Sequence, residues 1–82
     1  MPIAFVIIHC EPDQTYYVIR NLKNLPGVKS ADDVFGYYEI VCKVESDTHS
    51  ELEKIITGKI RKIEHIISTM TLTVVEGQGQ TM

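Results

Sequence analysis

The feature that most constrains the fold is an unbroken apolar run near the start of the chain, Ile3-Ala4-Phe5-Val6-Ile7-Ile8. Its β-branched and aromatic residues favour a β-strand. An antiparallel strand with one face in water alternates apolar and polar residues, and this run does not alternate. The strand is therefore either central with both faces covered, or its far face meets another subunit.

The rest of the chain alternates between helical and strand patterns. Pro12 suits the first turn of a helix, and apolar residues then recur at helical spacing. Thr48, with Glu51 three residues later, fits a capping box at the start of a second helix. We expect the elements to follow in this order: a strand at 3–8, a helix at 13–25, a strand at 28–35, a turn at Gly36-Tyr37, a strand at 38–45, a helix opening at 47–51 and a strand at 67–75.

This β-α-β-β-α-β order predicts the α+β ferredoxin-like fold, with a four-stranded antiparallel sheet in the spatial order 4-1-3-2. Right-handed crossovers place both helices on one face of that sheet. With 82 residues, the chain has the length of one small domain. We expect a core over about residues 3–76 and a frayed tail at 77–82.

The other face of the predicted sheet has no helix to cover it. Strand periodicity places Glu39, Val41, Lys43 and Glu45 on that bare face. On the last strand, Ser68, Met70, Leu72 and Val74 form the more apolar set and are expected to face the helices. Thr69, Thr71, Thr73 and Val75 then face outward. Because the first strand exposes apolar side chains in either register, we expect two copies to pack face to face.

Composition excludes several function classes. The net charge of −3 argues against nucleic acid as the main ligand, because phosphate binding needs a basic face. With no secretory segment and no apolar run of about 18 residues, we expect no membrane association, a cytoplasmic location and reduced thiols at Cys10 and Cys42. The chain has no CxxC or HxxxH spacing, so neither a metal site nor another cofactor is expected. The role of the two cysteines stays open.

Three segments carry a resemblance to a known family. They are Leu25-Pro26-Gly27-Val28, Val34-Phe35-Gly36-Tyr37-Tyr38-Glu39-Ile40 and Ser68-Thr69-Met70-Thr71-Leu72-Thr73-Val74-Val75. With the amphipathic helix between them, they resemble the effector-binding (RAM) domain of the Lrp/AsnC regulators over about residues 3–76. The chain departs from the family pattern at two places: Glu39 replaces the usual Asp, and His65-Ile66 replaces Gly-Val.

The resemblance implies a stand-alone effector-binding domain, without the family's DNA-binding domain, that takes part in transcription regulation. It implies dimers joined through their sheets, octameric rings of four dimers, and a full-length Lrp/AsnC regulator as a partner. It also implies that a small effector, an amino acid, binds between subunits. The effector contacts carried over are Gly36, Tyr37, Tyr38, Glu39, Ser68, Thr69 and Thr71. Glu39 would accept the ammonium, and hydroxyls and backbone N–H groups would bind the carboxylate.

Other interpretations of the same residues stay open. Gly36 suits any tight turn, Glu39 can pair with Lys43, and threonines are ordinary strand residues. The domain can be a purely architectural oligomerisation module, or an ACT-like regulatory subunit of a metabolic enzyme. Small dimeric enzymes also use this fold, and His9 and Glu39 are the candidate acid/base groups near the sheet. We expect no catalysis, because no nucleophile–base pattern is present.

Overall fold

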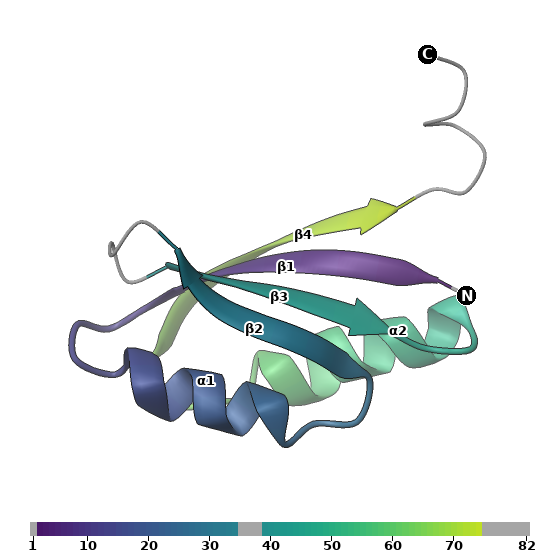
Figure 1. Ribbon diagram of the computed structural model, residues 1–82. Coiled ribbons are helices and arrows are strands. Elements are labelled where there is room, and N and C mark those ends of the chain that lie inside the picture. Colours follow the sequence, from purple (N-terminus) through teal and green to yellow (C-terminus); the bar gives the residue numbers. More distant parts are fainter. Residues whose placement is uncertain (1, 35–38, 75–82) are drawn as a thin grey trace, which may run out of the picture.

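The computed structural model describes residues 2–34 and 39–74. Its four strands form one antiparallel sheet in the order β2-β3-β1-β4, which confirms the predicted topology. Both helical segments lie on the same side of this sheet (Figure 1). The elements are β1 (Ile3–Cys10), α1 (Thr15–Lys23), β2 (Val28–Val34), β3 (Glu39–Glu45), α2 (His49–Ile55), the π-helical turn η1 (Ile56–Ile60) and β4 (Ile66–Val74).

The central position of β1 accounts for its unbroken apolar sequence. It pairs with β3 on one side and with β4 on the other. Ala4, Val6, Ile8 and Cys10 point toward the helices and are fully buried. The alternate side chains of β1 point to the opposite face and are only half-buried. Both faces of β1 are therefore apolar, but in this chain only one of them is covered.

The helices begin and end for local reasons. Asp13 has a φ of 68°, which is outside the helical region, so α1 begins at Thr15 rather than at the predicted residue 13. The predicted N-cap of the second helix is confirmed at Thr48, whose side chain accepts a hydrogen bond of 3.1 Å from the Glu51 backbone N–H. After α2 the backbone widens into one π turn, in which the Arg61 N–H donates to the Ile56 carbonyl at 3.2 Å.

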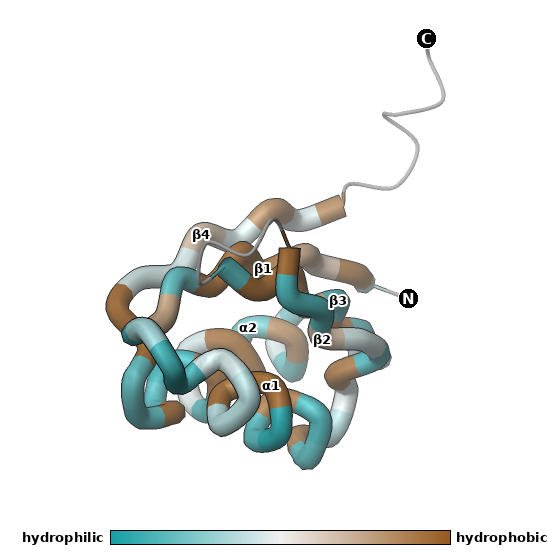
Figure 2. Tube along the Cα trace, turned by 60° about the vertical axis from the view of Figure 1, so that its left-hand side comes forward, coloured by the Kyte–Doolittle hydropathy of each residue, from teal (hydrophilic) through white to brown (hydrophobic). Residues whose placement is uncertain are grey.

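One hydrophobic core fills the space between the sheet and the helices. Figure 2 shows the hydrophobic stretch of β1 above the two helices. The helices bury the predicted apolar stripes against β1 and β3, and burial of this kind is the main stabilising contribution to folding. The core residues are Ala4, Val6, Ile8, Cys10, Val18, Leu22, Ala31, Ile40, Cys42, Val44, Leu52, Ile55, Ile56 and Ile60.

The predicted orientation of β4 is wrong. Thr69 lies opposite Ile8, Thr71 opposite Val6 and Thr73 opposite Ala4. Directly paired residues of an antiparallel sheet point to the same face, so these threonines face the helices. The apolar alternate residues, expected in the core, point to the uncovered face instead. The exposed fractions are 60 % for Met70, 52 % for Leu72 and 42 % for Val74.

This correction makes the uncovered sheet face more apolar than predicted. We call it the open face. Its apolar part lies over β1 and β4, where Phe5 pairs with Leu72 and Ile7 pairs with Met70. Its charged part lies over β3, where Lys43 is opposite Phe5 and Glu39 is opposite His9. A contiguous apolar patch with a charged border is typical of a protein interface.

The loop before β4 shows why the glycine of the family pattern can be replaced by His65. His65 has a φ of 75°, in the left-handed region that glycine adopts without strain. Its imidazole Nδ1 lies 3.2 Å from a Glu11 carboxylate oxygen, and its ring meets the edge of Tyr17 at 5.1 Å between centroids. The Glu11 backbone N–H also donates to the His65 carbonyl at 2.9 Å. Side-chain contacts thus offset the backbone strain.

We expect His65→Ala to lower the free energy of unfolding by about 1 kcal/mol, because alanine keeps the strained φ and loses the Tyr17 contact. His65→Gly loses the same contact but removes the strain, so its stability should stay within about 0.5 kcal/mol of the native value. Urea unfolding of both variants at one protein concentration checks this. Equal losses in the two variants would show that the backbone conformation at residue 65 carries no strain.

Candidate functional site

Three polar residues form a row across the end of the open face. His9 on β1 pairs with Glu39 on β3 and with Ser68 on β4, so all three side chains lie on the same side of the sheet. The pairing of β1 with β4 shifts its register directly after His9. Such irregularities re-aim side chains and are common beside functional sites. Glu39 and His9 are half-buried, and Ser68 is exposed.

The chemistry of this row suits a small ligand that carries both charges. The Glu39 carboxylate can accept hydrogen bonds from an ammonium group. The His9 ring N–H and the Ser68 hydroxyl can donate to a carboxylate. Neighbouring strands lie about 5 Å apart, so the three side chains are close enough to contact one small ligand placed between them. The apolar patch of the open face begins next to it, with Ile7 and Met70.

The predicted effector contacts divide between two faces of the sheet. Glu39 and Ser68 lie on the open face, whereas Thr69 and Thr71 lie on the helix side, opposite Ile8 and Val6. The prediction that Glu39 and Thr71 share the open face is therefore wrong. The remaining predicted contacts, Gly36, Tyr37 and Tyr38, lie outside the described residues.

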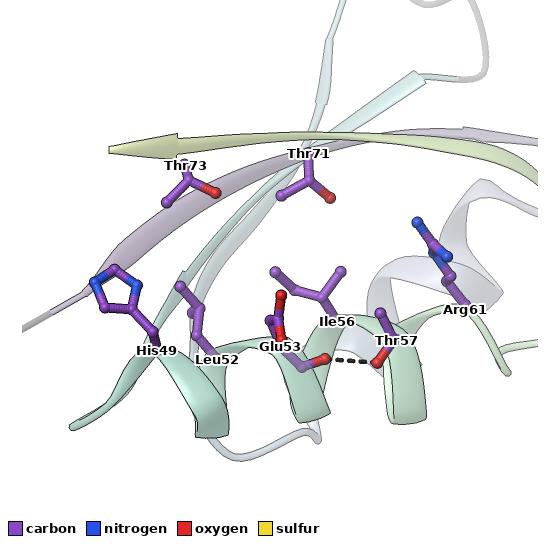
Figure 3. Close-up of a pocket in the computed structure, with 8 residues that line it drawn as sticks. All are labelled: His49, Leu52, Glu53, Ile56, Thr57, Arg61, Thr71 and Thr73. Carbon is purple, nitrogen blue, oxygen red and sulfur yellow. Dashed lines mark hydrogen bonds between the residues drawn. The ribbon is translucent and has the colours of Figure 1, made fainter. Parts of the chain in front are cut away.

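Thr71 belongs instead to a groove between β4 and the second helical segment (Figure 3). Thr71 and Thr73 point from β4 toward the helix, and side chains of α2 and η1 point back toward them. Sequence analysis assigned no site to these helical residues. One pattern in the sequence could have identified them: polar residues recur at every fourth position, at His49, Glu53, Thr57 and Arg61.

The two cysteines lie in the core, on the side of the sheet that the helices cover. Cys10 is buried with its Sγ 3.7 Å from the Thr15 hydroxyl oxygen. Cys42 is fully buried on β3, and burial raises the pKa of its thiol to about 11. A thiol with a raised pKa is a poor nucleophile near neutral pH, so Cys42 is a packing residue.

The raised pKa of Cys42 predicts a loss of stability in alkali. In the unfolded chain the thiol ionises near its ordinary pKa of 9, whereas the folded chain keeps it protonated up to about pH 11. The contribution to the free energy of unfolding is complete below pH 9 and falls by about 2 to 3 kcal/mol as the pH rises to 11. Urea unfolding across this range should show a flatter profile for Cys42→Ala. If the native chain and Cys42→Ala lose stability equally over this pH range, the raised pKa of Cys42 is contradicted.

The described residues offer neither a metal site nor a membrane span. Within residues 2–34 and 39–74, no three His, Cys, Asp or Glu side chains gather closely enough to hold a metal ion. In the same part of the chain, no helix is long and apolar enough to cross a lipid bilayer.

The sequence matches one known protein family over nearly its whole length. Residues 3–79 match the model of the Lrp/AsnC ligand binding domain. The chain belongs to the Lrp/AsnC ligand-binding domain family. Similar curated proteins include an HTH-type transcriptional regulator of Pyrococcus abyssi, 37 % identical over 69 residues, with 84 % of this chain and 44 % of the regulator covered. A homocitrate synthase of Sulfurisphaera tokodaii is 36 % identical over 74 residues, with 89 % of this chain but 16 % of the enzyme covered.

This Lrp/AsnC domain thus spans less than half the length of the curated proteins described above. Most of the matched relatives are transcription regulators, and the match to an enzyme is confined to a small part of it. A solved hypothetical protein of Pyrococcus horikoshii is similar throughout, with 33 % identity, a TM-score of 0.84, and 100 % of this chain and 99 % of that chain covered. A Neisseria meningitidis transcriptional regulator, solved as a complex with L-Met, shares the fold at 9 % identity and a TM-score of 0.76, with 94 % of this chain and 51 % of that chain covered.

Proposed function

We propose that this Lrp/AsnC domain binds a small amino acid at the boundary between two subunits and thereby controls an amino-acid-responsive transcription regulator. The observation that carries the proposal is the row of Glu39, His9 and Ser68 at the end of an apolar, uncovered sheet face. When a second copy packs on the open face, it closes this row into a site between subunits. The ammonium of the amino acid binds Glu39, and its carboxylate binds His9 and Ser68.

The apolar patch supports assembly through the open face. Phe5, Ile7, Met70 and Leu72 make direct cross-strand pairs there, and in a monomer they would stay in contact with water. In the proposed assembly, dimers of this kind associate further into a ring of four dimers. A full-length regulator of the same family is the proposed partner in the cell.

The family relationship supports an amino acid as the effector. The matched family is a ligand-binding domain, and the Neisseria meningitidis regulator of the same fold was solved with L-Met. Glu39 carries a longer side chain than the usual Asp, so its carboxylate reaches further toward the ligand. We therefore propose a small amino acid, which leaves room for that reach.

We expect Glu39→Gln to weaken binding of the effector by about 1.5 to 3 kcal/mol, because it removes one charge-assisted hydrogen bond and preserves size. A thermal-melting screen against the twenty amino acids identifies the effector, because a ligand that binds only the folded chain raises the melting temperature. Isothermal titration then compares the native chain with the variant.

Glu45→Gln is the matched control. Glu45 is the last residue of the same strand, on the same face and similarly half-buried, but it lies opposite Ile3 at the far end. Its variant should bind the effector as the native chain does. Equal affinity in Glu39→Gln and in the native chain would remove Glu39 from the site. A screen in which no amino acid raises the melting temperature would favour a purely architectural module.

A further inference from the structure

The groove between β4 and the second helical segment has the features of a separate ligand site. Its volume is about 250 Å³, slightly below the range that holds drug-sized ligands, and so it suits a smaller metabolite. Buried Leu52 and Ile56 supply its apolar floor. Polar side chains reach into it from both walls (Figure 3). It lies on the helix side of the sheet, whereas Glu39 lies on the open face.

The π turn aligns the polar wall of this groove. In a regular α-helix, each step of four residues drifts by about 40° around the axis, so three steps would turn Arg61 about 120° away from His49. The wider turn at Ile56–Ile60 reduces that drift, because it takes more residues to complete a turn. His49, Glu53, Thr57 and Arg61 consequently line one groove. Single π turns within helices occur frequently at functional sites.

The charges along this wall define the ligand that fits. Glu53 supplies one carboxylate and Arg61 supplies one guanidinium to the lining. The Thr57 hydroxyl donates to the Glu53 backbone carbonyl at 2.7 Å, so its oxygen can still accept a hydrogen bond. Thr71 and Thr73 add hydroxyls from the opposite wall. A ligand with a single charge can form an ion pair with only one of Glu53 and Arg61, whereas a zwitterion can pair with both.

The spacing of the two charges selects among zwitterions. Arg61 follows Glu53 by eight positions, which is at most about 12 Å along the helix axis, because the π turn between them rises less per residue than a regular α-helix. The two side chains can lean toward each other, so the distance between their charged groups is shorter still. The ligand therefore carries its ammonium and carboxylate several bonds apart, joined by an apolar chain that covers Ile56. We infer that the groove binds an ω-amino carboxylate, a class that includes the distal ammonium and the carboxylate of free basic amino acids.

The test uses the full chain and 6-aminohexanoate as the probe in isothermal titration. Hexanoate and hexylamine are the matched probes, because each keeps the chain and one of the two charges. We expect 6-aminohexanoate to bind, and both single-charge probes to bind at least about tenfold more weakly. Arg61→Gln and Glu53→Gln should each lower the affinity of the chain for 6-aminohexanoate by at least about tenfold. Lys62→Gln and Glu64→Gln remove the same charges from exposed neighbours outside the groove, and should bind normally.

Each outcome decides the assignment. Loss of binding in the two groove variants alone supports it. Absence of any 6-aminohexanoate binding at millimolar concentration overturns it. Binding that survives Arg61→Gln and Glu53→Gln but is lost in Glu39→Gln also overturns it, and places the ligand on the open face, in support of the proposed function. If no amino acid binds through Glu39 while 6-aminohexanoate still binds the groove, the proposed function is overturned and this inference stands.

Discussion

Gly27→Ala is expected to lower the free energy of unfolding by about 3 kcal/mol, a large part of the stability of a small domain. Gly27 has a φ of 88°, where alanine is strained. A Cβ at this position would also lie 2.7 Å from Ile55 Cδ1 and 2.8 Å from the Glu45 carbonyl oxygen. The isoleucine side chain can move aside, but the carbonyl is backbone of β3 and is held in place. The Glu45 N–H of the same strand donates a hydrogen bond to the Gly27 carbonyl at 2.8 Å.

Gly58→Ala is the matched control for this prediction. Gly58 lies in η1, and a Cβ there would meet no atom within 4 Å beyond its own turn of helix. Alanine favours helical backbone over glycine, so this variant should gain about 0.5 to 1 kcal/mol. Urea unfolding at one fixed protein concentration compares the two. A Gly27→Ala variant as stable as the native chain would mean that the turn before β2 is less tightly packed than described.

Leu72→Glu is expected to raise the dissociation constant of the proposed face-to-face dimer at least about 100-fold. Leu72 lies opposite Phe5 in the apolar patch of the open face. In a symmetric dimer each substitution is present twice, so two charges lose contact with water for every interface formed. Because Leu72 is half-exposed in a single subunit, the folded subunit itself should remain stable. Sedimentation equilibrium across a dilution series measures the change.

Tyr16→Glu is the control for this second prediction. Tyr16 lies on α1 and is 87 % exposed, so its replacement also removes exposed apolar surface and adds a charge, but on the other side of the molecule. Across the same dilution series, the average mass of the Tyr16→Glu variant should equal that of the native chain. If Tyr16→Glu dissociates the assembly and Leu72→Glu does not, then subunits associate through the helices rather than through the open face.

The element order and strand order could be predicted because each rests on a local pattern. The apolar run of β1 indicated either a central strand or one whose far face meets another subunit, and Thr48 located the start of α2 as its N-cap. The start of α1 was less predictable, because the spacing of apolar residues does not indicate the left-handed backbone at Asp13.

The orientation of β4 could not be predicted by assigning its more apolar residues to the core. That rule holds when a sheet has one buried face. In this chain both faces are apolar, so Met70 and Leu72 belong to the open face, and Thr71 packs on the helix side through its register with Val6. The pairing of β4 with β1 fixes this orientation, and it joins residues about sixty positions apart in the sequence.

The candidate site was only partly predictable for the same reason. Glu39 and Ser68 were identified from the family resemblance. His9 lies between them through strand pairing on both sides, and was considered only as an acid/base group. The groove depends on the π turn that brings Arg61 into line with Glu53, and no rule for regular helices indicates such a turn.

If an amino acid binds at the boundary between subunits, as proposed, then its binding and the association of the subunits are thermodynamically linked. Sedimentation equilibrium tests this directly, at a protein concentration where native dimers partly dissociate, with each of the twenty amino acids added in turn. We expect at least one amino acid to raise the average mass above its ligand-free value, and Glu39→Gln to abolish the increase. A chain that stays at 9.3 kDa under all of these conditions would contradict it.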